Sequence, residues 1–372
     1  MDVGLSGGEA QALNPDSLLN AIHKEKKVMT MFCSSKPRLL CVREAHLFVA
    51  LILLLIGCSS LAVSADGLFI AVGGGGRILT SRDGATWDKV NEWDNKWADD
   101  SNLLHSAAAG LGKIVVAGGG GWTRETQAGH ILVSNDGKEW RDVAKYPQRV
   151  IPVLFHGERF VAGGSNGLLW STDGEKWNVG VTPDELKAKR AAASATPMKG
   201  VNFRKGAAGN GIFLITGDAD GKVSWSVTTR DGKSIESFTV GSPPVGGVAF
   251  GAGKFLIAGR DGVFTSTDAL KWNREENAPA DELWRVEWSG SEFITSGKKG
   301  SYRSADGTAW KPFGKKAPGW IAAAGPHGYV ALNWGANLSF SLDGEKWTPA
   351  TQPSAARQME KVIYVEQPRK TE

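Results

Sequence analysis

The chain has 372 residues, of which 41% are hydrophobic and 22% charged, a composition typical of a globular protein with an apolar core. Its 43 basic and 39 acidic side chains leave a net charge of +4, too balanced for a protein that binds nucleic acid electrostatically. The 48 glycines against 15 prolines indicate many tight turns rather than a disordered chain.

Residues that bind metals or form disulfide bonds are few. The cysteines are Cys33, Cys41 and Cys58, so the chain beyond residue 58 can form neither a disulfide bond nor a thiolate metal site. The histidines beyond that point are dispersed: His105, His130, His156 and His327. Because no two of them have the spacing of zinc ligands, we expect no bound metal. The glycine runs at 73–76 and 118–121 lack the lysine and threonine of a phosphate loop, so we expect no cofactor either.

The longest apolar run, LFVALILLLIGC, covers residues 47–58. The eleven residues before its cysteine are too few for a membrane-spanning helix, which needs about 20. The length fits the apolar region of a signal peptide, and Lys36, Arg38 and Arg43 supply the positive charges that precede such a region. We therefore interpret residues 1–57 as a signal or leader segment.

The end of this run, Leu55-Ile56-Gly57-Cys58, resembles the lipobox of bacterial lipoproteins. The resemblance implies that Cys58 carries a diacylglycerol group and becomes the mature N-terminus, with acyl chains as a membrane anchor. Ser59 is not the aspartate associated with inner-membrane retention, which favours the outer membrane or the periplasmic side of a bacterial envelope. A plain secretion signal, a short membrane anchor and a later start of translation at Met29 or Met31 stay open as alternatives.

A short motif recurs seven times after the leader, beginning with SRDGATW at 81–87. Its first residue is Ser81, Ser134, Ser171, Thr229, Ser266, Ser304 or Ser341, and its aspartate is Asp83, Asp136, Asp173, Asp231, Asp268, Asp306 or Asp343. Tryptophan closes six copies, Ile235 replaces it in the fourth, and Ala269 replaces the glycine of the fifth. Successive copies are 53, 37, 58, 37, 38 and 37 residues apart, which is the spacing of a repeat array with a period near 37.

Apolar runs separated by glycine turns lead into the motifs, as in KFLIAGRDGVFTSTD at 254–268. Another short run precedes many of them, as in LWRVEWS at 283–289, and a further strand opens at each closing tryptophan. Such patterns predict antiparallel strands. Four strands in a unit of about 40 residues, repeated seven times, predict an all-β fold, namely a seven-bladed β-propeller of four-stranded antiparallel blades.

The motif is expected to form the turn between the third and fourth strands of each blade. An aspartate in a tight turn accepts hydrogen bonds from backbone N–H groups, and a serine hydroxyl does the same. Glycine adopts angles that other residues resist, and tryptophan buries its ring between sheets. The motif resembles the Asp-box, or BNR, repeat of sialidase-type propellers, one residue shorter than S-x-D-x-G-x-T-W. The resemblance implies that the aspartates are structural and bind neither calcium nor substrate.

The segment KVIYVE, at 361–366, stands where the first strand of an eighth repeat would begin, whereas the first repeat has little room for its own first strand. We expect this C-terminal strand to be the inner strand of blade 1, which closes the ring and removes an exposed sheet edge. The expected domains after the leader are a lipidated N-terminus and linker at 58–66, the propeller at 67–366 and a tail at 367–372.

Three connections are enlarged: residues 91–105 after blade 1, 119–130 within blade 2 and 180–200 after blade 3. All three should emerge on the face opposite the motifs, and loops inserted in a rigid scaffold are where binding residues gather. The candidate binding residues there are Trp93, Asp94, Trp97, Asp99, Asp100, His105, Trp122, Arg124, Glu125 and His130. The three tryptophans either stack on sugar rings or peptide side chains or pack the loops onto the ring. The composition of residues 184–195 predicts one short helix on that face.

The Asp-box resemblance raises enzymatic alternatives. Sialidases use an arginine triad, an acid/base aspartate and a tyrosine activated by glutamate, but here only Tyr364 has a nearby glutamate, Glu366, and no facing arginine cluster is evident. A carbohydrate-active hydrolase of the Asp-box propeller type, with two carboxylates drawn from Asp94, Asp99 and Glu125, is the alternative function.

A lipid-anchored seven-bladed ring with these turns also resembles the photosystem II assembly factor family, which chaperones a membrane protein complex. The usual turn of that family carries one more glycine, so the resemblance implies a protein-binding scaffold and not a photosynthetic client. We therefore expect a monomeric, non-catalytic, envelope-anchored binding or assembly platform that uses the face opposite the motifs. Its partner is a protein or a glycan and not a nucleic acid.

Overall fold

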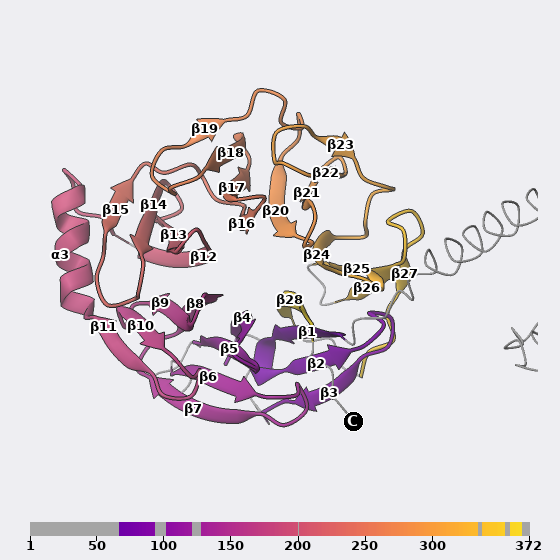
Figure 1. The fold of residues 1–372 in the computed structure, drawn as a ribbon, viewed down its shortest axis with the longest axis horizontal. Coiled ribbons are helices and arrows are strands. Elements are labelled where there is room, and N and C mark those ends of the chain that lie inside the picture. Colours follow the sequence, from indigo (N-terminus) through magenta and orange to yellow (C-terminus); the bar gives the residue numbers. More distant parts are fainter. Residues whose placement is uncertain are drawn as a thin grey trace, which may run out of the picture. The chain divides into compact units, whose positions relative to one another are not determined.

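The computed structural model describes residues 67–93, 102–120, 128–199, 201–333, 337–353 and 358–366. They form seven four-stranded antiparallel sheets around a central axis, a seven-bladed β-propeller, as the repeats predict (Figure 1). The predicted leader, Cys58 and the linker lie outside the described residues. Within the described ranges, no helix combines the length and the apolar character that crossing a membrane requires.

Each blade runs outward from the axis through four strands in hydrogen-bonded order (Figure 1). Blade 1 contains β28 (Met359–Glu366), β1 (Gly67–Gly73), β2 (Ile78–Ser81) and β3 (Asp88–Asn91), with a 3-10 turn, η2 (Gly74–Gly76), after β1. Blade 2 contains β4 (Leu104–Gly110), β5 (Lys113–Gly119), β6 (Gly129–Ser134) and β7 (Arg141–Tyr146). Blade 3 contains β8 (Val150–His156), β9 (Arg159–Gly164), β10 (Leu168–Ser171) and β11 (Asn178–Val181).

The remaining blades repeat the same order. Blade 4 contains β12 (Val201–Gly209), β13 (Ile212–Ala219), β14 (Val223–Thr229) and β15 (Ser237–Val240). Blade 5 contains β16 (Gly247–Gly251), β17 (Lys254–Gly259), β18 (Gly262–Ser266) and β19 (Asn273–Arg274). Blade 6 contains β20 (Leu283–Trp288), β21 (Phe293–Gly297), β22 (Ser301–Ser304) and β23 (Lys311–Pro312). Blade 7 contains β24 (Trp320–Gly325), β25 (Gly328–Leu332), β26 (Leu338–Ser341) and β27 (Thr348–Pro349).

Blade 1 is built from both ends of the described chain. β28 pairs antiparallel with β1, so that Leu68 lies opposite Val365 and Ile70 lies opposite Ile363. This pairing makes β28 the innermost strand of blade 1, which confirms the predicted closure of the ring. The strand begins at Met359, two residues earlier than the sequence indicates.

The core consists of seven apolar clusters, one between each pair of neighbouring blades. Phe69 of blade 1 shares a cluster with Val330 of blade 7, and Leu214 of blade 4 shares one with Phe255 of blade 5. A strand between two such clusters is buried on both faces, so its sequence is a continuous apolar run; β1, GLFIAVG, is buried at every position.

The repeated motifs form the turns between the third and fourth strands. In the first turn the Ser81 hydroxyl donates to Asp83 Oδ1 (2.9 Å) and accepts from the Gly84 N–H (2.8 Å). Asp83 Oδ1 also accepts from the Ala85 and Thr86 N–H groups, each at 2.8 Å. The indole N–H of the closing tryptophan donates to the carbonyl of the turn glycine in five turns, at Trp87, Trp140, Trp177, Trp310 and Trp347.

The two turns with substituted residues depart from this pattern. In blade 5, Ala269 adopts a left-handed conformation with φ of 58°, and the buried Trp272 indole N–H has no hydrogen-bond partner in the described part of the chain. In blade 4, Ile235 takes the place of the tryptophan and packs in the cluster that contains the buried Leu186.

The helix predicted from residues 184–195 is present as α3 (Pro183–Ala193), but its expected position on the loop-bearing face is wrong. It lies against the outermost strand of blade 4, β15, at the rim of the ring (Figure 1). Thr182 and Glu185 cap its first turn reciprocally, so the helix starts directly after β11. Its one buried residue, Leu186, packs in the apolar cluster where Ile235 takes the place of the larger tryptophan. This contact accounts for the position of the helix at the rim.

Candidate functional site

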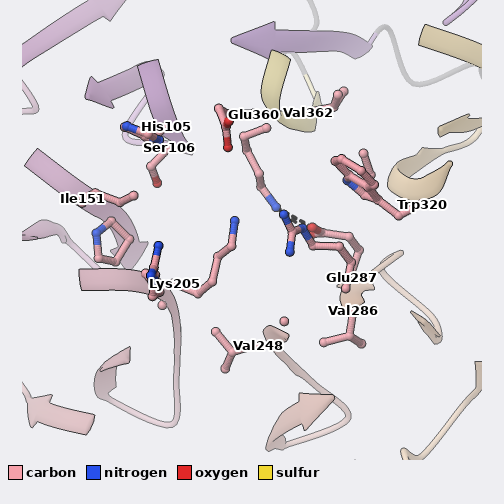
Figure 2. A pocket seen from close by; sticks show the side chains of 17 residues that line it. His105, Ser106, Ile151, Lys205, Val248, Val286, Glu287, Trp320, Glu360 and Val362 are labelled. Carbon is pink, nitrogen blue, oxygen red and sulfur yellow. Dashed lines mark hydrogen bonds and ion pairs between the residues drawn. The ribbon is translucent and has the colours of Figure 1, made fainter. Parts of the chain in front are cut away.

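A small cavity lies on the ring axis between the innermost strands (Figure 2). It encloses about 50 Å³ and receives side chains or backbone from all seven blades. Its polar lining comes mainly from four strands: His105 and Ser106 of β4, Arg204 and Lys205 of β12, Arg285 and Glu287 of β20, and Glu360 and Lys361 of β28. We call this space the axial cavity.

Irregular pairing of the innermost strands shapes the axial cavity. In blade 4, Phe203 lies opposite Gly217 and Lys205 opposite Thr216, so Arg204 is an extra residue on its strand. The same shift occurs in β4, β8, β20, β24 and β28, whereas β16 pairs without one. A bulge bends a strand and re-aims the neighbouring side chains. Repeated at one level of the ring, it turns polar side chains toward the axis.

The axial cavity lies toward the face on which the blades are connected to one another. Within each antiparallel blade the repeated turns occupy one face, and the connections between blades occupy the other, which we call the loop face. Each innermost strand of blades 2 to 7 enters from the loop face. His105 is the second of seven residues in β4 and Glu360 the second of eight in β28, so both lie in the half nearer to that face, whereas Lys205, the fifth of nine in β12, lies at the middle of its strand.

Most charged groups around the axial cavity are engaged by the protein. Lys361 Nζ contacts both carboxylate oxygens of Glu287, at 2.7 and 2.8 Å. Arg204 Nε binds Asp218 Oδ2 at 2.5 Å, and Gln358 Nε2 donates to Glu360 Oε1 at the same distance.

The Arg285 guanidinium is held by a different set of contacts. Its Nη1 donates to the carbonyls of Gly246 (3.2 Å) and Trp284 (3.0 Å). Its Cζ lies 5.1 Å from the centre of the Trp320 ring, a cation–π distance. No carboxylate of the described residues forms an ion pair with it, so its positive charge is only partly compensated by Glu360 and Glu287 nearby.

Lys205 is the exception in this group. Figure 2 shows its side chain pointing into the axial cavity. Within the described ranges its ammonium group forms neither an ion pair nor a hydrogen bond. The pKa of Lys205 is lowered to about 7, mainly by burial and also by the charges of Arg285 and Lys361, against the opposing effect of Glu360 and Glu287.

His105, on the opposite wall of the axial cavity, is also surrounded by positive charges. Burial lowers the pKa of its imidazole to about 3, and the positive charges of Arg149, Lys205 and Arg204 contribute to the shift. The imidazole is therefore neutral at physiological pH. A neutral histidine beside an unpaired ammonium leaves the cavity with a positive potential that a bound anion would relieve.

The structure describes three of the ten predicted binding residues. Trp93 and His130 come together, with ring centres 4.8 Å apart, and Trp93 packs on the cluster between blades 1 and 2. His130 Nδ1 lies 2.7 Å from Asp142 Oδ2, and His105 lines the axial cavity. The others lie outside the described residues: Asp94, Trp97, Asp99, Asp100, Trp122, Arg124 and Glu125. Within the described ranges, His, Cys, Asp and Glu side chains form no group of three that could hold a metal ion.

The sequence analysis did not identify the charged residues of the innermost strands as a site. A usable signal was present in LWRVEWS, which was assigned to a first strand and carries Arg285 and Glu287 two positions apart. Side chains two apart in a strand share a face. Two charges on one face of an innermost strand do not fit the apolar clusters between blades and therefore indicate a polar site near the axis.

A larger hollow of about 860 Å³ lies between blades 5 and 6, lined by charged side chains of their connection. Several of these charges bind within the protein. Arg260 pairs with Glu282 at 3.3 Å, and Arg274 donates to the Asp261 carbonyl at 3.2 Å. Asp281 accepts from the Lys299 N–H at 2.9 Å. The hollow is therefore a less specific candidate than the axial cavity.

No protein-family model matches the chain, and no curated protein has a significantly similar sequence. Similar solved structures include a chain of a nidogen/laminin complex, with 12% identity, coverage of 80% of this chain and 98% of that one, and a TM-score of 0.44. Apo AztD from Citrobacter koseri is 10% identical, and the match covers 78% of this chain and 83% of that one with a TM-score of 0.47. Virginiamycin B lyase from Staphylococcus aureus is 12% identical, and the match covers 78% of this chain and 96% of that one with a TM-score of 0.41. Likeness at this level concerns the propeller fold alone.

Proposed function

We propose that the protein is a non-catalytic binding or assembly platform that holds its partner on the loop face of the ring. The observation that carries the proposal is the unpaired Lys205 in the axial cavity on that side of the molecule. Lys205 is half-buried, and a charge withdrawn from water without a partner destabilises a folded protein. Its presence in a closed, rigid scaffold is explained if a ligand supplies the missing partner.

The carboxylates of the axial cavity favour binding over glycan hydrolysis at this site. Such an enzyme needs two carboxyl groups free to act as acid and as base or nucleophile. The two carboxylates that line the axial cavity are Glu287, which Lys361 binds, and Glu360, which accepts from Gln358. Neither is free in this arrangement.

We further propose that the repeated turns are of the Asp-box type and serve as scaffold. Each aspartate, except Asp231 in the substituted turn of blade 4, accepts two backbone N–H groups of its own turn through Oδ1, as Asp136 does from Lys138 and Glu139. In this role the carboxylates bind backbone N–H groups of the turns that carry them.

The site of binding is tested by photo-crosslinking with the full chain in cells. A photo-reactive residue placed at Lys298, in the turn between β21 and β22 and therefore on the side opposite the repeated turns, should capture a defined protein partner. The same residue at Leu342, which is 74% exposed in a repeated turn, should not. Capture at Leu342 alone, or hydrolysis of glycans by the purified full chain, would contradict the proposed function.

The envelope anchor is a separate part of the proposal and rests on the sequence around Cys58. Mass spectrometry of the mature protein should find a diacylglycerol group on this cysteine and no residue before it. Cys58→Ala should leave an unprocessed or soluble form in the same fractionation. A mature N-terminus at another residue, or an unmodified Cys58, would disprove the lipid anchor but would not bear on the proposal that the loop face binds a partner.

A further inference from the structure

The charges around the axial cavity do not cancel. Arg204 pairs with Asp218, and Lys361 pairs with Glu287, which leaves Lys205, Arg285 and Glu360. Two cations then face one carboxylate, which already accepts from an amide. The uncompensated charge is that of one cation, and Lys205 is the side chain that points into the open space (Figure 2).

The size of the cavity limits what can neutralise this charge. About 50 Å³ holds a few water molecules or one small group, since one water needs roughly 10–15 Å³ measured in this way. A pocket that encloses a whole sugar or nucleotide is several times larger, at roughly 300–1,000 Å³. The occupant must therefore be a small anion or the anionic end of a larger molecule.

We propose that the axial cavity is a binding site for a single small oxyanion group, held by the Lys205 ammonium with Arg285 beside it. The inference deepens the proposed function and rests on it, because it names the chemistry that the loop face recognises. Charge-assisted hydrogen bonds from an ammonium to an oxyanion are among the stronger polar contacts in proteins. Val248 and Trp320 on the wall limit access of water to the bound group.

The site should bind its anion in a pH-dependent way. The groups that face Lys205 are His105 from β4, Arg285 and Glu287 from β20, Glu360 and Lys361 from β28, and Arg204 from its own strand. The pKa of about 3 keeps His105 neutral above pH 5, whereas Lys205, with a pKa of about 7, loses its proton between about pH 6 and pH 8.5. If only the ammonium form binds, affinity falls roughly thirtyfold over this range.

Calorimetric titration of the full chain with sodium sulfate tests the site. Sulfate keeps its charge over the whole range, so any pH dependence belongs to the protein. We expect one sulfate per chain, with the fall in affinity given above. Lys205→Met should weaken binding at least tenfold, whereas Lys271→Met, which removes an exposed lysine from a repeated turn, should not change it. Equal binding by Lys205→Met, or no saturable binding at any of these pH values, would overturn the inference.

A second measurement needs no substitution and therefore does not depend on how the variants fold. Titration of the Lys205 ammonium in the wild-type chain, followed by NMR, should show its pKa rise by at least one unit when sulfate is saturating. An anion bound elsewhere would leave this titration unchanged, and that result would also overturn the inference. Both measurements are independent of the crosslinking test. They can therefore disprove the oxyanion site without disproving that the loop face binds a partner.

The source of the oxyanion is decided by comparing probes. Sulfate and acetate represent free ions, and a short peptide with a free C-terminal carboxylate, set against its C-terminal amide, represents a group carried by a partner. Tighter binding of the free-carboxylate peptide than of acetate would assign the site to the end of a chain. Binding of the free ions alone would assign it to a free anion. Both results support the site, and both require loss on Lys205→Met.

Discussion

At the scale of single residues, glycines allow the innermost strands to interlock. Near the end of several of these strands a glycine lies against an aromatic ring of the next blade: Gly110 against Phe155, Gly209 against Phe250, Gly251 against Trp288, and Gly325 against Tyr364. A side chain at the glycine would occupy the space of the ring. Tyr364 is therefore accounted for as part of the closure, where its ring centre lies 5.0 Å from that of Phe69.

We predict that Gly251→Ala destabilises the ring. A Cβ at this position would overlap the Trp288 indole, and overpacking of this kind costs about 1–3 kcal/mol. The matched control is Gly300→Ala, because no atom lies within 4 Å of a Cβ built there. Chemical denaturation of both variants measures the difference. Equal free energies of unfolding would contradict the interlock.

The aspartates of the repeated turns make stability depend on acid pH. The pKa of Asp306 lies well below its ordinary value of 3.8 because the backbone N–H groups of Ala309 and Thr308 bind its carboxylate. The pKa values of Asp136, Asp268 and Asp343 are lowered for the same reason. The unfolded chain therefore binds protons at higher pH than the folded chain. This stabilisation is complete above about pH 5 and is lost as the pH falls through the folded-state pKa values.

Asp306→Asn tests this contribution. The variant should lower the melting temperature by a few degrees at pH 7, since the charged acceptor is lost. Below about pH 3 the difference from the wild type should shrink, because the carboxyl of the unfolded wild-type chain is then protonated, which favours unfolding of the wild type. A difference that stays constant from pH 7 to pH 2.5 would show that the ionised carboxylate is not what stabilises the turn.

Lys205 should have the opposite dependence on pH. Its folded-state pKa of about 7 is lower than that of an unfolded lysine, so the folded protein is penalised for the charge below about pH 7. The penalty fades as the pH rises toward about 10. Lys205→Met should therefore raise the melting temperature by a few degrees at pH 6, measured in a buffer without oxyanions, and by less at pH 9.5. A lower melting temperature at both pH values would contradict the view that this ammonium is unpaired.

At the scale of elements, β28 decides whether the ring is closed. It provides the innermost strand of blade 1, buries Met359 and Val362 and carries Lys361 into the axial cavity. We predict that deletion of residues 359–372 abolishes cooperative unfolding, because β1 and the clusters on either side of blade 1 lose their cover. Deletion of 367–372 is the control and should unfold like the full chain. Calorimetry that finds the same transition in both would contradict the closure.

The elements that sequence reasoning located are those with a repeated local signal. The SxDG turns, the glycine-bounded apolar runs and the extra strand at 361–366 each reflect chemistry within a few residues, and they are sufficient for the seven blades and for the closure. The position of α3 was not predictable in this way. It depends on the contact of Leu186 with a cluster that Ile235 completes from a distant part of the chain.

The axial cavity was even less predictable from the sequence than the position of α3. Arg204, Lys205, Arg285 and Glu360 come from three blades, and their convergence depends on strand bulges. The charged pair in LWRVEWS marks one of these strands but does not show which other strands meet it. Of the predicted binding residues, His105 alone lines this cavity, and it was chosen for its loop and not for the axis. The structure places this residue near the loop face, as the sequence predicts, but the sequence did not identify the cations beside it.

At the scale of the whole molecule, the ring supplies a fixed frame for the charges on its axis. Seven clusters hold neighbouring blades together, and each innermost strand is fixed by its own sheet and by both neighbours. A frame of this kind keeps Lys205 in the cavity although water would solvate it better. The proposed role of this ammonium is to bind an oxyanion on the axis of the closed seven-bladed ring.

Anomalous diffraction from crystals of the full chain soaked in sodium selenate tests this claim most directly. We predict one strong selenium peak on the ring axis, within hydrogen-bond distance of Lys205 Nζ, which is absent from crystals of Lys205→Met. Selenate bound only on the outer surface, with the axial cavity empty at saturating concentration, would contradict the claim.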